Sequence, residues 1–342
     1  MYDFLNDYNQ TVHPDLLKGF IDITHKKLSG YGLDYYCEQA KDNIKKTLKS
    51  PYADIHFMHG GTITNLTVIS HILRPYQAVI STESGHINVH EAGAIEATGH
   101  KVLTVKTEDG KLTPELIKPI LKHHSDEHMV QPKLIYISNT TELGTIYSKQ
   151  ELKKLYQFCQ NNHLYLYLDG ARLAMALASK DNDITFPDLA KYTDVFYIGG
   201  TKVGAFAGEA LVFNNLSINQ GFRFSMKQKG AILAKSWIVG VQMNTLMQNN
   251  LYIKLGKQSN DMADKLKTLF ENAGLTFKAK PQTNQLFVNF PNKVAKKILD
   301  YYSVDNLGQT DNKHICLRFC TSWATQDAEI DNFAKQMKKW IK

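Results

Sequence analysis

Two stretches of this 342-residue sequence carry the strongest indication of its fold, LYLYLDGAR (Leu164–Arg172) and VFYIGGTKVGAFAG (Val195–Gly208). Each begins with a short apolar run, which is typical of a buried strand. The first run ends in an aspartate, Asp169, followed by Arg172, and the second leads to Lys202 within a turn rich in glycine. The pattern raises the question of why a carboxylate and an amine should each follow a buried strand.

Short apolar runs alternate with amphipathic segments through the middle of the chain, which predicts βαβ units around a mostly parallel sheet. Strands are expected at 54–58, 77–82, 100–105, 132–138, 164–169, 194–199 and 209–213. Helices are expected between them at 61–73, 88–99, 113–124, 148–162 and 185–193.

From about Ser236 the pattern changes to long helices, 237–248 and 251–274, followed by short strands at 285–290 and 314–320 and a closing helix. This change predicts two units. Residues 1–245 would form an N-terminal segment and a large α/β domain, and residues 246–342 a smaller α+β domain.

The composition is that of an ordinary globular protein, with 43% hydrophobic and 21% charged residues. The net charge of +7 comes from lysines dispersed over helical faces, which argues against a nucleic-acid surface. We expect no membrane span and no secretory signal, and therefore a cytoplasmic protein. The four cysteines are scattered and are interpreted as free thiols.

The segment HGGTITNL follows the first expected strand and opens a helix. Backbone N–H groups at Gly60, Gly61 and Thr62 could hold a phosphate at the helix N-terminus. The segment lacks the known phosphate-loop patterns, so a tight turn with a threonine N-cap is the alternative.

Asp169 has two interpretations. It could cap the next helix, or it could be a buried acceptor for a cationic ring nitrogen, and Arg172 could pair with it. Burial of Lys202 would lower the pKa of its amine and suit it to Schiff-base chemistry.

His86 and His90 have the spacing of a metal pair on a helix, but no third ligand is evident and no metal site is predicted. A lone His86 packed against a flat aromatic ligand fits the position better.

Pyridoxal phosphate would account for these features together. It needs an amine for its aldehyde, a carboxylate for its pyridine nitrogen, a cradle for its phosphate and a flat group against its ring. Each can be named here, in the chain order expected of one fold.

At these residues the chain resembles the pyridoxal-phosphate enzymes of fold type I, the aspartate aminotransferase-like fold. In particular it resembles the low-specificity L-threonine aldolase group of the β-eliminating lyase family. The resemblance runs over nearly the whole chain. The segments that carry it, in order, are NDYNQTVHPDLL, YGLD, HGGTITN, GHINVHEAG, DGAR, GGTK and LRFCTSW.

The resemblance implies a role for each cofactor-binding residue. Lys202 would bind the cofactor covalently, Asp169 would hold the pyridine nitrogen and Arg172 would lie near the phenolic oxygen. His86 would stack on the ring and assist proton transfer, so Lys202 and His86 are the expected catalytic residues. The phosphate-binding residues would be Gly60, Gly61 and Thr62, with Asn65 nearby, and Thr201 would also belong to the cofactor site.

The resemblance also implies a substrate site and an oligomer. Arg318 would bind the substrate α-carboxylate, and Asn6 and Tyr31 would line the substrate pocket. A homodimer or homotetramer with shared active sites is expected, in which Lys229, or Lys227, reaches a neighbour's cofactor phosphate.

Three positions depart from the family's pattern. Asn6 stands where the family has its opening serine, and Thr201 precedes the lysine where serine is commoner. The family's Glu-Asn-Thr-His motif is replaced by SNTTELG, from Ser138 to Gly144, so the histidine proposed to deprotonate the β-hydroxyl is missing.

The sequence therefore predicts retro-aldol cleavage of L-threonine or L-allo-threonine to glycine and acetaldehyde. Another reaction of an amino acid at the same cofactor, such as β-elimination, transamination or racemisation, is the alternative suggested by the altered loop. A non-enzymatic cofactor or metal binder is a third hypothesis.

Overall fold

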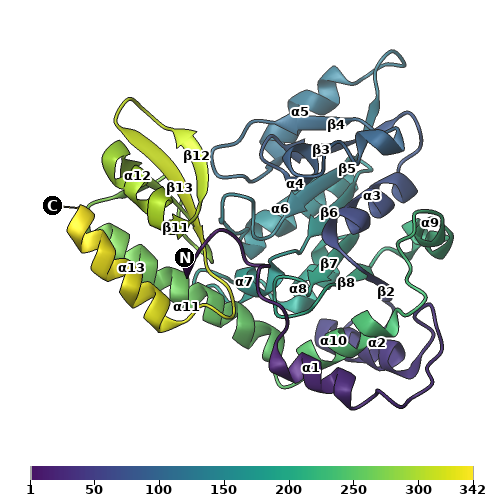
Figure 1. Cartoon of the computed structure of the whole chain (residues 1–342). Helices are drawn as coiled ribbons and strands as arrows, with labels where there is room; N and C mark the ends of the chain where they lie inside the picture. Colours follow the sequence, from purple (N-terminus) through teal and green to yellow (C-terminus); the bar gives the residue numbers. More distant parts are fainter. Residues whose placement is uncertain (1, 342) are drawn as a thin grey trace.

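The computed structural model describes residues 2–341, and its centre is a seven-stranded sheet of order β2-β8-β7-β6-β5-β3-β4 (Figure 1). Strand β8 is antiparallel to both of its neighbours, and the other pairs are parallel. The strands are β2 (Asp54–Met58), β3 (Gln77–Thr82), β4 (Val102–Val105), β5 (Gln131–Ser138), β6 (Tyr165–Asp169), β7 (Val195–Gly199) and β8 (Glu209–Phe213). All seven predicted strands are confirmed, with small shifts at their ends.

Helices cover both faces of this sheet, as expected for a parallel sheet buried on two sides. The first face is covered by α3 (Gly61–Ile72), α4 (His86–Val89) and α9 (Phe222–Gln228). The opposite face is covered by α2 (Tyr35–Leu48), α5 (Pro114–His123), α6 (Lys149–Asn161), α8 (Phe186–Tyr192) and α10 (Trp237–Leu246).

Side chains alternate between these two faces along the central strands. In β6, Leu166 and Leu168 join the core on the α6 side, whereas Tyr167 joins the core on the α3 side. Tyr136 of β5 and Tyr197 of β7 join the same α3-side core as Tyr167. Three buried tyrosines from adjacent strands therefore lie on one face of the sheet.

The helix expected over 88–99 is wrong. The structure has the short helix α4 and a 3₁₀ turn, η1 (Glu96–Thr98), in this region. Ala92 and Gly93 between them have φ values of 50° and 74°. A left-handed backbone cannot continue a right-handed helix, so the chain turns here.

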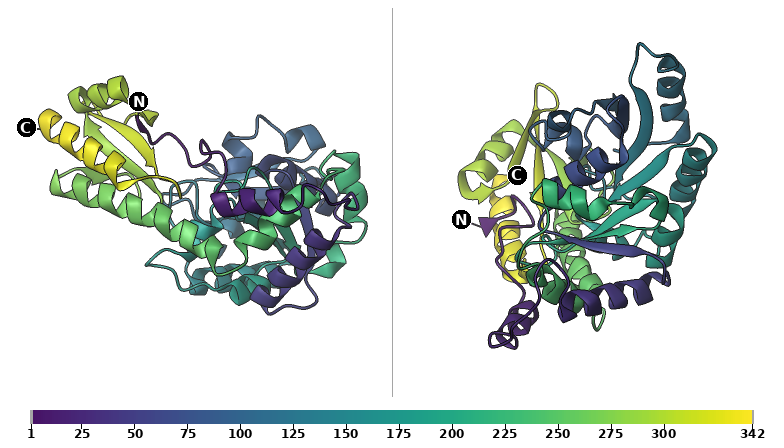
Figure 2. Two further views of the ribbon diagram at one scale, coloured as in Figure 1. Left: turned by 60° about the horizontal axis from the view of Figure 1, so that its bottom comes forward. Right: turned by 90° about the vertical axis from the view of Figure 1, so that its right-hand side faces the viewer.

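A smaller lobe is built on an antiparallel sheet of order β12-β13-β10-β9, which confirms the two strands predicted near 285 and 314. Its strands are β9 (Thr276–Phe277), β10 (Gln285–Pro291), β12 (Asp305–Gln309) and β13 (His314–Cys320). Its helices are α11 (Leu251–Asn272), α12 (Asn292–Tyr301) and α13 (Asp327–Trp340). The long helix α11 reaches from the large lobe into this one (Figure 2).

The N-terminal segment joins the two lobes. Strand β1 (Tyr2–Asp3) pairs in parallel with β11 (Tyr302–Ser303), and Phe4 is buried in the core of the small lobe. Further along, before α1 (Pro14–Ile21), the backbone N–H of His13 donates to the carbonyl of Gly204. The segment thus runs from the small core to the turn that carries Lys202. The division at residue 245 stays a prediction.

The remaining helical elements are α7 (Leu173–Leu177) and η2 (Leu216–Ile218). All four cysteines are free and buried. In the part of the chain that the structure describes, no helix combines the length and the apolar character needed to cross a membrane.

Candidate active site

The candidate site lies at the carboxyl edge of the central sheet, where ligands bind in open α/β folds. Asp169 is the last residue of β6 and is in register with Ser138, the last residue of β5. Lys202 follows the end of β7 at Gly199, and Gly61 opens α3 after β2. The expectation that the aspartate and the lysine each follow a buried strand is confirmed, and the structure shows that the two strands, β6 and β7, are adjacent.

Asp169 is a buried carboxylate, 4% exposed, that accepts four hydrogen bonds. Its Oδ2 accepts from Tyr136 Oη at 2.5 Å and from Asn65 Nδ2 at 3.1 Å. Its Oδ1 accepts from Tyr197 Oη and from the backbone N–H of Ala171 at 2.9 Å. The two tyrosines reach it because they lie on the same face of neighbouring strands.

These donors keep Asp169 ionised. Burial acts to raise the pKa of Asp169, but the nearby charge of His86 and the hydrogen bonds from Tyr136 and Tyr197 outweigh burial and hold the pKa below its ordinary value. A carboxylate held in this form can stabilise a cation beside it.

His86 is connected to Asp169 through a chain of side chains. The Nδ1 of His86 lies 2.9 Å from Glu91 Oε1, and Asn65 Nδ2 donates to the same oxygen at 2.7 Å. Tyr167 Oη donates to Asn65 Oδ1 at 2.6 Å and so fixes the orientation of the amide. The side chain of His86 remains 31% exposed, whereas that of Glu91 is fully buried.

His86 and His90 have ring centroids 5.5 Å apart. Over residues 2–341, no group of three or more His, Cys, Asp or Glu side chains is placed to hold a metal ion.

The amine of Lys202 is the group that the sequence predicts to react with the cofactor. Within residues 2–341 its Nζ has no hydrogen bond or ion pair, and only part of the side chain is exposed. Burial and the charge of Arg172 lower the pKa of Lys202. A larger fraction of neutral amine, with a free lone pair, suits nucleophilic attack on an aldehyde.

Thr201, which was expected to bind the cofactor, has its hydroxyl engaged by a second buried carboxylate. Thr201 Oγ1 donates to Glu209 Oε1 at 2.7 Å and accepts from the N–H of Gly208 at 3.1 Å. Glu209 Oε2 accepts from the N–H of Gly200 at 2.8 Å. Burial raises the pKa of Glu209 to about 7.

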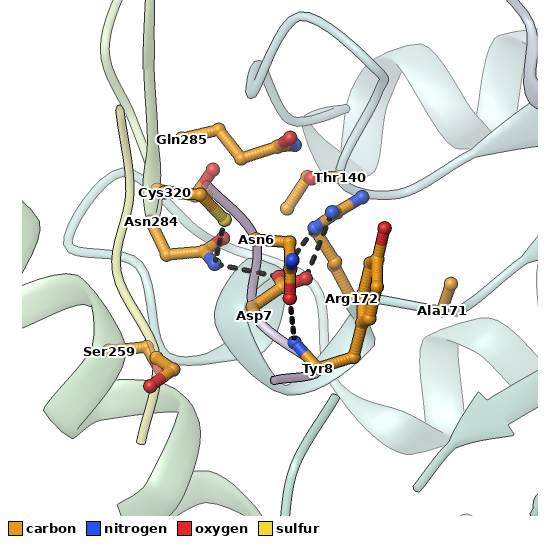
Figure 3. A network of polar contacts seen from close by, with 12 residues as sticks. Asn6, Asp7, Tyr8, Thr140, Ala171, Arg172, Ser259, Asn284, Gln285 and Cys320 are labelled. Carbon is orange, nitrogen blue, oxygen red and sulfur yellow. Dashed lines mark hydrogen bonds and ion pairs between the residues drawn. The ribbon is translucent and has the colours of Figure 1, made fainter. Parts of the chain in front are cut away.

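Arg172 is paired with Asp7 and not with Asp169 (Figure 3). Two contacts join them, Nε to Oδ2 at 2.7 Å and Nη2 to Oδ1 at 3.0 Å, and Asn284 Nδ2 donates to Asp7 Oδ2 at 2.9 Å. Burial opposes ionisation of Asp7, but the charges of Arg172 and Lys202 lower its pKa to about 2.

Asn6 and Tyr31 lie in different surroundings. Asn6 precedes Asp7 at the site, and its Oδ1 accepts from the N–H of Tyr8 at 2.9 Å. Tyr31 is 43% exposed, and its ring lies 4.8 Å from Lys227 Nζ. No hydrogen bond or cation–π contact in the described chain joins Tyr31 to Lys202.

Lys229 is near this second region, and its Nζ donates to Gln228 Oε1 at 3.4 Å. The expected role of Tyr31 in the substrate pocket, and that of Lys229 or Lys227 at a neighbour's cofactor phosphate, stay predictions.

Arg318 comes from β13 of the small lobe and carries an unused donor. Its Nη2 contacts Asp305 Oδ2 at 3.1 Å and the carbonyl of Leu5 at 3.2 Å. Its Nη1 donates to Gln285 Oε1 at 3.4 Å. The Nε of Arg318 and the Nε2 of Gln285 are buried without a hydrogen-bond partner among residues 2–341. Two such donors close together suit an anionic acceptor.

The N-terminus of α3 is open to a ligand. Gly60 is its N-cap and offers no side-chain cap, and Thr62 is exposed. A Cβ on Gly61 would lie 3.3 Å from Tyr197 Oη, so the turn approaches the hydroxyl closely. The first N–H groups of the helix are therefore available to an anion.

Sequence reasoning missed several residues that the structure brings to the site, namely Asp7, Tyr136, Tyr197, Glu91, Glu142, Glu209 and Gln285. The tyrosines and Glu209 lie in apolar runs and were counted as strand residues. The quoted NDYNQ segment contained Asp7, but nothing local indicated a partner 165 positions away.

Comparison with known proteins identifies the family. The sequence profile of the family described as beta-eliminating lyase matches residues 28–293. The chain belongs to the beta-eliminating lyase family. Enzymes of this family depend on pyridoxal phosphate.

Relatives within the beta-eliminating lyase family are similar over the full length of the chain. The low specificity L-threonine aldolase of Pseudomonas sp. (strain NCIMB 10558) is 26% identical over 342 residues, which cover 98% of this chain and 96% of that protein. The solved structure of Leishmania major threonine aldolase is 44% identical, covers 100% of both chains and has a TM-score of 0.98.

The predicted fold is confirmed by these comparisons. Aspartate aminotransferase from Thermus thermophilus matches with a TM-score of 0.70 over 97% of this chain and 89% of that one, at 13% identity. The beta-eliminating lyase described here therefore has the aminotransferase-like fold of type I.

Proposed function

We propose that this protein is a pyridoxal-phosphate-dependent aldehyde-lyase that cleaves the Cα–Cβ bond of a β-hydroxy-α-amino acid. L-Threonine or L-allo-threonine would yield glycine and acetaldehyde. One observation carries the proposal. An amine without a hydrogen bond, that of Lys202, and an ionised carboxylate, that of Asp169, follow or end adjacent strands at the same edge of the sheet. The full-length similarity to threonine aldolases supports this choice of substrate.

The residues present fit the cofactor. Asp169 would hold the protonated ring nitrogen, and His86, with part of its ring exposed, would lie against the ring. Lys202 would bind the aldehyde. The uncapped N-terminus of α3 at Gly60, Gly61 and Thr62 would bind the phosphate, with Thr201 nearby. When bound, pyridoxal phosphate supplies an electron sink for the electron pair that cleavage leaves at Cα.

The small lobe would form the substrate side of the site. Arg318 would bind the α-carboxylate through its planar guanidinium, with Gln285 Nε2 as a neighbouring donor. Because Arg172 is tied to Asp7, its position beside the site does not depend on the substrate. Arg318 would thus hold the α-carboxylate of the substrate, and this contact would help to orient the scissile Cα–Cβ bond.

Reconstitution with pyridoxal phosphate tests this function. We expect an absorption band of the lysine-bound cofactor that changes on addition of L-threonine, followed by release of glycine and acetaldehyde. Lys202→Ala should lose both the band and the turnover. Bound cofactor without glycine would reject the aldolase assignment, and release of keto acid, ammonia or a D-amino acid would identify the alternative reaction.

We also infer a homodimer or homotetramer with shared active sites. The exposed apolar residues Leu33, Tyr35 and Phe224, at 64%, 67% and 83% exposure, each lie within four positions along the chain of Tyr31 or Lys227, which contact each other. Such a patch suits contact with another subunit. The molar mass in solution, measured by light scattering, tests the assembly. The cytoplasmic location and the absence of nucleic-acid binding stay predictions.

A further inference from the structure

The loop that follows β5 begins inside the candidate site. Ser138 is in register with Asp169, and the N–H of Asn139 donates to the Asp169 carbonyl at 3.0 Å. Figure 3 shows Thr140 from this loop together with Asp7 and Arg172. The loop therefore leaves the sheet beside Asp169.

Glu142 turns back from this loop toward the site. Its Oε1 accepts from Ser138 Oγ at 2.6 Å and from the backbone N–H of His86 at 3.1 Å. Its Oε2 has no hydrogen bond within residues 2–341, and the side chain is partly exposed. One carboxylate oxygen is thus anchored while the other can receive a proton.

The remaining acidic residues of the site are each committed elsewhere. Asp7 pairs with Arg172, and Asp169 accepts four hydrogen bonds. The side chain of Glu91 is fully buried and contacts His86. Both oxygens of buried Glu209 accept hydrogen bonds, from the N–H of Gly200 and the hydroxyl of Thr201. Among these acids, Glu142 alone combines an unbonded oxygen with partial exposure.

The neighbouring hydroxyl of Thr141 points elsewhere. Its Oγ1 lies 2.7 Å from Thr145 Oγ1 and 3.5 Å from the carbonyl of Asp109, and the residue is fully buried. The hydroxyl of Thr141 is therefore not available to a substrate, whereas Glu142, the next residue, keeps one oxygen without a hydrogen bond among residues 2–341.

We propose that Glu142 takes the proton of the substrate's β-hydroxyl group, an assignment that rests on the aldolase function proposed above. The hydroxyl O–H bond breaks and its proton forms an O–H bond on Glu142. The oxygen forms the C=O bond of acetaldehyde as the Cα–Cβ bond breaks. The electron pair of the Cα–Cβ bond stays on Cα and becomes the new C–H bond of glycine when Cα takes up a proton from water. Glu142 then releases to water the proton that it took from the hydroxyl group.

The local electrostatics favour this role. Burial, together with the charge of Asp169, raises the pKa of Glu142, although Ser138 and His86 act in the opposite direction. Tyr136, Tyr147 and Arg172 also lie within electrostatic reach of this carboxylate. A carboxylate of higher pKa is a stronger base.

Glu142→Gln in the cofactor-loaded enzyme tests the proposal. The amide keeps the size of the side chain and can still accept from the His86 N–H, but it cannot take a proton. We expect the rate of L-threonine cleavage to fall about 100-fold or more. Exchange of the glycine α-proton in D₂O, followed by NMR, involves no hydroxyl and should be unchanged, as should the cofactor absorption band.

Glu151→Gln is the matched control, since Glu151 is a partly buried glutamate that belongs to the capping box of α6 and pairs with Lys111. It should change neither rate. Cleavage near the wild-type rate in Glu142→Gln would overturn the proposal, and so would a parallel loss of glycine exchange, which would indicate a structural role. Wild-type enzyme that exchanges glycine but cleaves no β-hydroxy amino acid would overturn the proposed function, and this inference with it.

Discussion

Asp7 and Arg172, which are 165 positions apart in the sequence, form a buried two-point ion pair with contacts of 2.7 and 3.0 Å. Asn284 of the small lobe donates to the same carboxylate (Figure 3). The carboxylate of Asp7 therefore connects the N-terminal segment with both the large lobe and the small lobe. Because the charge of Arg172 also lowers the pKa of Lys202, this pair links the stability of the chain to the electrostatics of the candidate site.

Asp7→Asn should lower the free energy of unfolding of the cofactor-free protein by about 3–5 kcal/mol at neutral pH, because it leaves the guanidinium of Arg172 buried without a counter-charge. The pKa of Asp7 is lowered from 3.8 to about 2, so its contribution is complete above the unfolded value and is lost as the pH falls through about 2. Denaturant titrations of both proteins from neutral to acid pH check this. An equal difference at neutral pH and near pH 2 would contradict it.

Tyr136→Phe and Tyr197→Phe should each weaken binding of pyridoxal phosphate by about tenfold or more, because each removes a hydrogen bond to the ionised Asp169. The pH dependence of the cofactor absorption band should shift in both variants. Tyr147→Phe is the control, since this buried hydroxyl accepts from the N–H of Leu112 and does not contact Asp169. Unchanged affinity in both site variants would remove the tyrosines from the cofactor site.

Glu209→Gln should stabilise the cofactor-free protein at alkaline pH. Burial raises the pKa of Glu209 from 4.5 to about 7, so its contribution to stability is complete below the unfolded value and is lost as the pH rises through about 7. The glutamine side chain of the variant carries no charge at any pH, and the two stability curves should separate by an amount on the order of 3 kcal/mol above that range. Thermal unfolding at pH values on both sides of neutrality measures this, and parallel curves would refute it.

Arg318→Lys should raise the dissociation constant of glycine about tenfold to 100-fold, because an ammonium cannot replace the fork of donors that meets a carboxylate. Asp305→Asn is the comparison, since it removes the ion pair with Arg318 and leaves the guanidinium in place. It should bind glycine at least as well as wild type does. Spectroscopic titration of the cofactor-loaded enzyme measures both, and unchanged binding in Arg318→Lys would place the carboxylate elsewhere.

Much of this protein could be predicted from local patterns. Apolar runs of strand length, separated by amphipathic segments, are recorded directly in the order of residues, and they predict the parallel sheet. Since the carboxyl ends of such strands share one edge, the order of residues is enough to bring Asp169, Lys202 and the Gly60 turn together. The helix predicted at 88–99 failed because the left-handed conformation of Ala92 carries no local signal.

The order of residues thus accounts for the sheet, its succession of elements and the residues that follow its strands. The partners of those residues depend on the folded chain as a whole. In the sequence, Tyr136 and Tyr197 are ordinary strand residues, and only the register of the strands brings their hydroxyls to Asp169. The roles of Asp7 and Glu142 can be recognised only from their contacts with distant elements. The physical reason is that periodicity encodes which face a side chain occupies, whereas a hydrogen bond depends on where two separate parts of the chain come to rest.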